Sequence, residues 1–267
     1  MSFGVSANQQ SIEYGTNHIP SLLWHPTLRY NRHYWGMLKD IIRFNHHGKQ
    51  FLRHNSPDEP LYRFIKKHHL SSWFQKYFLL PMAGSIWSTP LEKIDHFSTK
   101  KLLEFFDNHG LLSLFNQPQW YSIQGGSHQY LKAFERHFKG QIHCQCAIES
   151  IQSHKQGLEL LDQKGQQHHF DHVILACHSD QAAACLETHY PEKATLLRSI
   201  PYQKNHVVCH SDTRFMPKQS SAWASWVYLQ DHSNPHAISL TYWMNNLQAI
   251  PHSPPILVTL NPQFSPE

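Results

Sequence analysis

The pattern of apolar and polar positions divides the chain into stretches of different character. Residues 2–24 form short extended pieces interrupted by Gly15 and Pro20, which predicts strands and turns. Residues 25–115 carry apolar side chains at helical spacing, and the remainder is dominated by short strand-like runs separated by turn residues. This order predicts a mixed fold of helices and strands.

The first long helix is predicted from Tyr30 onwards. Trp35, Leu38 and Ile42 fall at positions i, i+3 and i+7, and Ile41 lies beside them. Such spacing places side chains on one face of an amphipathic helix. We therefore expect a helix whose apolar face carries these residues.

Several shorter helices are expected to follow. Two are predicted at residues 60–69 and 71–80, with Pro81 ending the second. Residues 89–92 read Thr-Pro-Leu-Glu, the pattern of a capping box with proline at the first helical position. A last helix of this group is expected to close at Gly110.

Beyond residue 120 the sequence predicts a helix and then a series of strands. Ser127 can cap a helix with an apolar face of Leu131, Phe134 and Phe138. The strand expected at 168–177 ends in the wholly apolar Val-Ile-Leu-Ala-Cys, as in a parallel-sheet strand covered on both faces. Further elements are expected at 142–144, 148–153, 158–161, 203–211, 222–229, 237–244 and 256–260 (strands) and at 181–187 (a helix).

The composition is that of a globular protein. The 15 Phe, 11 Tyr and 8 Trp are too many for a disordered chain. Charged residues make up 16%, against about 25% in typical domains, and 24 histidines fill part of the gap. The net charge of +4 is mild and scattered, so no basic, aromatic-rich patch indicates nucleic-acid binding.

Cysteine usage and hydropathy predict a cytoplasmic protein. Five cysteines are an odd number, and several sit in apolar strand-like segments, which favours buried free thiols in a reducing compartment. The first residues show no basic region followed by an apolar run, so no signal peptide is expected. No apolar run approaches the roughly 18 residues of a membrane span.

Motifs for metal binding or hydrolysis are not found. The histidine pairs, such as His46-His47, are adjacent residues whose side chains diverge, so a pair does not form a bidentate site. There is no H-E-x-x-H, and the pair Cys144-x-Cys146 lacks zinc spacing and a partner pair. No serine lies in a G-x-S-x-G elbow. The sequence thus predicts no metal site and no hydrolase, and a histidine-based metal binder stays as a third hypothesis for the chain.

A set of segments spread over the chain carries a family resemblance. They are LLPMAGSIWSTP (79–90), FFDNHGLL (105–112), PQW (118–120), GGS (125–127), FDHVILACH (170–178), WASW (223–226) and TYWMN (241–245). In these segments the chain resembles the flavin-containing amine oxidase superfamily, and within it the bacterial predicted NAD/FAD-binding proteins.

The resemblance implies an α/β fold with intertwined domains. Residues 121–199 would form a partial FAD-binding, Rossmann-like domain with a β-meander. Residues 1–120 and 200–267 would form the two parts of a substrate domain, a mixed sheet roofed by helices.

It also implies which residues approach the cofactor, FAD. Gly125 and Gly126 would open the helix of the FAD-binding domain, and Ile148 matches the position whose backbone lies against the adenine. The turn Ala176-Cys177-His178 would also approach FAD.

Two parts of the family pattern are missing from this sequence. One is the strand, G-x-G-x-x-G turn and helix whose amides bind the pyrophosphate, and the other is a carboxy-terminal segment. We therefore expect a truncated flavoprotein or one piece of a split one, with a separate chain supplying the missing FAD-binding unit. The alternative is a non-catalytic remnant.

The candidate catalytic residues are His206, which falls near a family lysine position, and Lys204 two residues earlier on the same strand face. A histidine there could act as an acid or base near neutral pH. Either residue can equally be an ordinary strand position.

A small-molecule substrate, apolar or lipid-like, is expected beside the flavin. The implied chemistry is hydride transfer from a C–H bond of this substrate to the flavin. Its candidate contacts, which could equally be core aromatics, are Trp87, Trp223, Trp226, Tyr242 and Trp243.

Overall fold

The computed structural model describes residues 2–7, 10–16, 22, 28–113, 118–230, 238–248, 250–251 and 253–267. The chain forms two compact units, one of Met1–Ala133 with Asn205–Glu267 and one of Phe134–Lys204. Pro20, expected as a break, lies outside the described residues. The domain boundaries expected at 121 and 199 stay a prediction.

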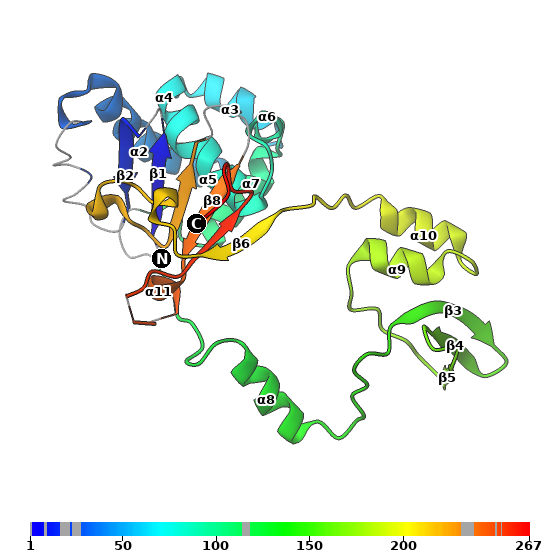
Figure 1. Cartoon of the computed structure of the whole chain (residues 1–267). Helices are drawn as coiled ribbons and strands as arrows, with labels where there is room; N and C mark the ends of the chain where they lie inside the picture. Colours follow the sequence, from blue (N-terminus) through cyan, green and yellow to red (C-terminus); the bar gives the residue numbers. More distant parts are fainter. Residues whose placement is uncertain are drawn as a thin grey trace. The chain divides into compact units, whose positions relative to one another are not determined.

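The first unit is built on a six-stranded mixed sheet with the order β2-β1-β7-β8-β9-β6 (Figure 1). β1 and β7 are parallel, and every other neighbouring pair is antiparallel. The strands are β1 (Phe3–Ala7), β2 (Ile12–Gly15), β6 (Val207–His210), β7 (Trp226–Leu229), β8 (Ser239–Trp243) and β9 (Leu257–Leu260).

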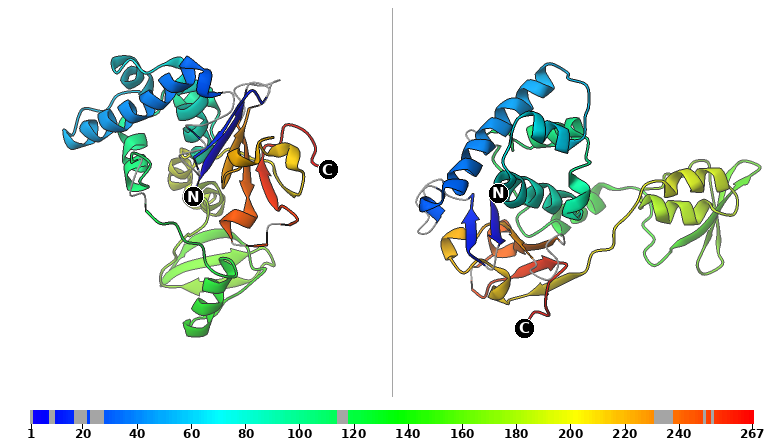
Figure 2. Two further views of the ribbon diagram at one scale, coloured as in Figure 1. Left: turned by 90° about the vertical axis from the view of Figure 1, so that its left-hand side faces the viewer. Right: turned by 90° about the horizontal axis from the view of Figure 1, so that it is seen from above.

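Helices cover one face of this sheet (Figure 2). The largest core cluster of the described residues joins side chains of β1, β2 and β7 to those of the helices. The helical segments are η1 (Leu28–Tyr30), α2 (Arg32–Arg53), α3 (Leu61–Lys67), α4 (Ser72–Phe74), η2 (Gln75–Leu79), α5 (Leu80–Trp87), α6 (Leu91–Ile94) and α7 (Thr99–Asn108), with η3 (Thr213–Phe215), η4 (Ser220–Ala222) and α11 (Met244–Leu247) later in the chain.

The long helix α2 was predicted, but its buried face was assigned wrongly. Ile41 is buried as expected, whereas Trp35 and Ile42 are exposed by 43% and 56%. The core side is centred on Phe44, which packs against rings of α3, α4 and α7. Several apolar residues lie around this helix, so a count of positions at i+3 and i+7 selected the wrong set.

Pro81 does not end a helix, because the preceding residues form a π-helix. In η2 the amide of Leu80 donates to the carbonyl of Gln75, five residues earlier, and α5 then continues through Pro81. A proline cannot donate to the carbonyl four residues before it, here that of Tyr77. The hydroxyl of Tyr14, which is buried, donates to this carbonyl instead. The missing hydrogen bond is thus replaced from β2.

The capping box expected at residues 89–92 is also not formed. Pro90 is the N-cap of α6 and makes no side-chain cap, while the Thr89 hydroxyl donates to the Trp87 carbonyl 3.0 Å away. The helix that was predicted to close at Gly110 is α7, and Gly110 adopts a φ of +69° just beyond it.

The second unit is a three-stranded antiparallel meander packed against two helices. Its strands β3 (Ile148–His154), β4 (Gly157–Asp162) and β5 (Gln167–Phe170) lie in sequence order, and α9 (Ser179–Leu186) and α10 (Pro191–Arg198) follow. A small core joins the strands to the helices. The meander and α9 were predicted, and α10 was not.

Of the strands predicted in this region, the one at 142–144 is not formed, and the one at 168–177 is formed only as far as Phe170, as part of β5. Residues 141–143 and 172–176 have no regular secondary structure, and Ile174 is exposed by 90%. A strand is defined by its ladder, and no described strand pairs with 173–177. An apolar run alone was therefore not sufficient to identify a strand.

The helix predicted after Ser127 is α8 (His128–His137), which begins in the first unit and ends in the second.

All five cysteines are free, as predicted, but the prediction that they are buried is wrong. Cys144, Cys177 and Cys209 are exposed, and the other two are half-buried. Among the described residues, no helix is long and apolar enough to cross a membrane.

Replacing Tyr14 by Phe tests the role of its hydroxyl beside Pro81. The variant leaves the buried Tyr77 carbonyl without this donor, so we expect the free energy of unfolding to fall by about 1–3 kcal/mol. Urea denaturation measures the change. Tyr30→Phe removes a hydroxyl from a side chain that is 78% exposed and should shift stability by less than about 0.5 kcal/mol. Equal losses in the two variants would contradict this account.

Candidate functional site

The glycine pair forms an open turn directly before α8. Gly125 and Gly126 have φ values of +78° and +83°, which side-chain-bearing residues rarely adopt. A Cβ at Gly125 would meet the Gln129 side chain at 2.9 Å, whereas one at Gly126 would have no atom within 4 Å. The backbone of Gly126 is therefore accessible to a ligand.

Ile148, the position implied to contact adenine, begins β3 at the edge of the meander. Its carbonyl accepts a hydrogen bond from the Cys185 thiol at 3.1 Å. The ladder with β4 is irregular between Ile148 and Ser150. On its other side, β3 has no strand partner among the described residues.

The turn Ala176-Cys177-His178 is exposed and leads into α9. The imidazole of His178 stacks on Tyr202 with 4.5 Å between ring centroids. The His178 amide donates to the Gln181 side chain at 3.3 Å. This hydrogen bond caps the amino-terminal end of α9.

The two candidate catalytic residues, expected on one face of a strand, both precede β6, an edge strand of the large sheet, and neither lies in it. His206 immediately precedes β6, and its amide donates to the Asn261 side chain at 3.0 Å. The imidazole of His206 and the ammonium of Lys204 are both exposed. Their roles stay predictions.

Four of the candidate aromatic residues form two pairs on opposite faces of the large sheet. Trp226 on β7 lies directly across from Tyr242 on β8, with ring centroids 5.6 Å apart. Trp243 follows Tyr242 along β8, so its side chain points to the other face, where it meets Trp223 at 5.2 Å. A single substrate cavity can therefore be lined by only one of these two pairs.

These two pairs differ in their surroundings. Trp226 packs against the helical core, and burial raises the pKa of the Tyr242 hydroxyl. Trp223 donates from its ring N–H to the Pro217 carbonyl at 2.8 Å and packs with the small cluster on the far face. Trp87 packs on Phe97 and Phe105 within the helical layer. The pair Trp226–Tyr242 is the one that lies on the side of the helices.

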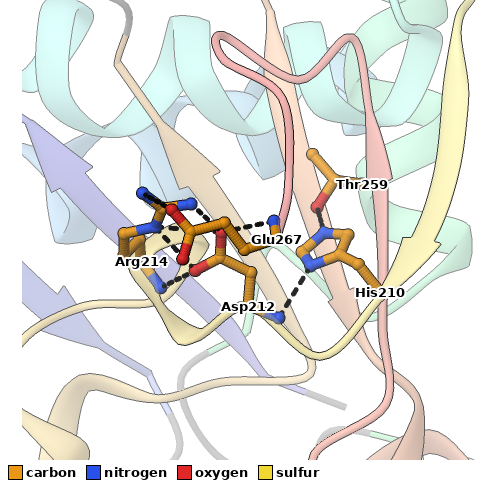
Figure 3. Close-up of polar contacts among 5 residues, drawn as sticks. All are labelled: His210, Asp212, Arg214, Thr259 and Glu267. Atoms are coloured by element: carbon orange, nitrogen blue, oxygen red, sulfur yellow. Dashed lines mark hydrogen bonds and ion pairs between the residues drawn. The ribbon is translucent and has the colours of Figure 1, made fainter.

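A polar cluster that was not predicted lies at the end of β6 (Figure 3). The amide of Asp212 donates to Nδ1 of His210 at 3.1 Å, while Nε2 of His210 lies 2.7 Å from the Thr259 hydroxyl. Arg214 donates to both carboxylate oxygens of Asp212 and pairs with Glu267 at 2.9 Å. The cluster therefore brings together residues of β6, β9 and η3 and the carboxy-terminal residue of the chain.

The geometry of this cluster holds His210 in its neutral form. Because Nδ1 accepts a backbone N–H, the proton resides on Nε2, and adding a second proton would break this bond. Burial lowers the pKa of His210, although Asp212 opposes the shift. The hydrogen bonds from Arg214 hold the pKa of Asp212 well below its usual range. The alternation His-x-Asp-x-Arg over residues 210–214 is the sequence pattern that could have indicated the cluster.

The sequence matches a known protein family over most of its length. A family model described as flavin containing amine oxidoreductase matches residues 18–257. The chain belongs to this family, whose members are flavin-dependent oxidoreductases, and the predicted family and mixed α/β fold are confirmed. No curated protein matches the sequence.

A solved structure shows the same fold. It is a protein of Exiguobacterium sp. 255-15, provisionally described as a protoporphyrinogen oxidase, with a TM-score of 0.51 and 16% sequence identity. The match covers 77% of this chain and 45% of that chain, so the present chain spans about half the length of this relative.

The His210 cluster predicts a pH dependence of stability. Unfolded histidine takes up a proton below pH about 6.5, whereas folded His210 does so only at lower pH, so acidification favours unfolding. We expect His210→Gln, which retains polar groups but cannot become charged, to lose less stability than wild type between pH 7 and pH 5. Chemical denaturation at several pH values measures this difference.

His189→Gln provides the control, because His189 is exposed. Its loss of stability on acidification should match that of the wild-type chain. If His210→Gln also follows the wild-type pH profile, the neutral state assigned to His210 is wrong.

Proposed function

We propose that this chain is part of an FAD-dependent oxidoreductase that removes hydride from an apolar organic substrate. The observation that carries the proposal is the family match over residues 18–257. When bound, the flavin accepts the hydride and passes the electrons on. The protein contributes cofactor binding, substrate orientation and exclusion of water.

The residues present fit a nucleotide cofactor through backbone groups. At Gly126 the absence of a side chain and the open space allow close approach to the peptide group. At Ile148, β3 is an edge strand, and peptide groups along such an edge are donors and acceptors of the kind that can recognise a base. Each feature lies in a different unit.

We further propose that another polypeptide segment, on a separate chain if the protein is split, supplies the pyrophosphate-binding turn. The exposed apolar run at 174–177 supports this proposal, because such a run is stabilised by neighbouring strands. The greater length of the solved relative supports it as well.

The substrate is proposed to be apolar, on the basis of the aromatic pair Trp226–Tyr242. Paired rings provide a large apolar contact with a polar group at one end. His206, with Lys204 nearby, would serve as the acid or base at the open end of β6.

A non-catalytic remnant is the second candidate function. The same exposed run favours it, since unpaired apolar strands promote aggregation. This candidate predicts a chain that binds no flavin under any condition, so the cofactor test separates the two.

Gly126→Ala is the variant that tests cofactor binding by this chain. FAD is titrated onto the purified chain, and bound flavin is followed by visible absorption and fluorescence. We expect the variant to weaken binding at least tenfold, about 1.4 kcal/mol, because the methyl group occupies the open approach to the turn.

Gly165→Ala is a matched control, because Gly165 has a φ of +76° and a Cβ placed there would likewise meet no atom within 4 Å. Both variants impose the same backbone strain, so only a ligand at the turn distinguishes them. Equal affinities for the two variants would rule out the Gly126 turn as a cofactor contact.

A chain that stays colourless after FAD addition and desalting would be co-expressed with a chain that carries the strand, G-x-G-x-x-G turn and helix. Retention of flavin only in the complex supports the split flavoprotein. Absence of flavin in both cases favours the remnant. With flavin bound, faster anaerobic reduction by a polar than by a lipid-like substrate would contradict the apolar-substrate proposal.

A further inference from the structure

Three potential metal ligands meet at one end of the meander. Nε2 of His168 lies 3.0 Å from Oδ2 of Asp162, and Sγ of Cys146 lies 3.4 Å from the same oxygen. All three ligand atoms lie within 4.8 Å of one another. They come from β4, from β5 and from the irregular segment before β3.

Asp162 is held in place by the turn that follows it. Its side chain is buried, and Oδ1 accepts the amides of Lys164 at 2.8 Å and Gln166 at 2.9 Å. Oδ2 is thereby directed at Cys146 and His168. Carboxylate ligands of metal ions are typically oriented by such outer hydrogen bonds.

The spacing matches what tetrahedral zinc requires. With bonds of about 2.3 Å to sulfur and about 2.0–2.1 Å to nitrogen and oxygen, ligand atoms stand roughly 3.3–3.6 Å apart. The observed 3.0 and 3.4 Å lie close to these values, so small side-chain shifts suffice. Hydrogen bonding alone produces similar distances, and an experiment must distinguish the two.

We propose that Cys146, Asp162 and His168 bind a zinc ion. A thiolate and an imidazole favour zinc over magnesium or calcium, which prefer oxygen ligands alone. On binding, the Cys146 S–H bond breaks, the sulfur–zinc bond forms and the proton passes to solvent. Three protein ligands leave the fourth position to water, and the ion fastens the segment before β3 to the β4–β5 hairpin.

Another group of ligands on the same sheet is a weaker candidate. His154, Glu159 and His169 also lie together, but the contact of His169 with Glu159 is 3.7 Å and the group lacks a thiol. Glu159 also accepts a hydrogen bond from Gln152. This group competes with the proposed site and therefore provides a control.

The proposal is tested by titrating the full-length chain, stripped by a chelator, with Co²⁺ as a probe. We expect one ion per chain, an intense visible spectrum of tetrahedral cobalt and a thiolate-to-metal charge-transfer band. Zinc should displace the cobalt and raise the melting temperature. Cys146→Ser should abolish the charge-transfer band, and His168→Gln should weaken binding at least tenfold.

Two controls are matched to these variants. Cys144→Ser removes an exposed thiol two residues from Cys146, and His169→Gln alters the competing group next to His168. Both should retain the wild-type spectrum and affinity. Absence of the band in the wild-type chain, its persistence in Cys146→Ser, or its loss in either control would overturn the proposal.

A measurement without variants covers the case in which substitution prevents folding. Zinc should slow alkylation of Cys146 but not of Cys144, as read by peptide mass spectrometry. Equal rates with and without zinc would count against the site. Because no flavin is involved, the outcome is independent of the proposed oxidoreductase function.

Discussion

The parallel pairing of β1 with β7 is the constraint on which the first unit depends. Phe3 lies opposite Trp226, so the first strand is inserted into a sheet formed otherwise by β2 and the last part of the chain. Glu13 on β2 adds a second connection between the two ends of the chain, because its buried carboxylate accepts hydrogen bonds from the amides of Lys218 and Gln219. Residues 134–204 are therefore an insertion between two parts of the chain that share one sheet.

Much of this architecture was predictable because local patterns specify elements. Turn glycines and short apolar runs located the meander, and helical spacing located α2. The buried face of a helix was less predictable, because a helix rich in apolar residues offers more than one candidate face. Ile42, which was assigned to the buried face of α2, is exposed. The role of Pro81 was predicted wrongly because the donor that replaces its missing N–H, the Tyr14 hydroxyl, comes from a distant strand.

The candidate site shows the same division between local and distant information. The turn at Gly126 was predicted from two letters, and its positive φ follows from them. The division of Trp226 and Trp243 between two faces follows from strand register, which the sequence does not show. The contact of His210 Nε2 with the Thr259 hydroxyl joins two strands that are distant in sequence, and no local pattern indicates it.

The π-helix of η2 has a consequence for comparing relatives of different length. Each residue of a π-helix turns the chain by less than the roughly 100° of an α-helix, so a bond that spans five residues there covers about the same rotation as an α-helical bond that spans four. Deleting one residue within Gln75–Leu79 would therefore restore regular α-helical bonding and leave Trp87 facing Phe97 and Phe105. A relative that is one residue shorter here can thus present the same side of α5 to its neighbours, because the additional residue is accommodated within a single turn.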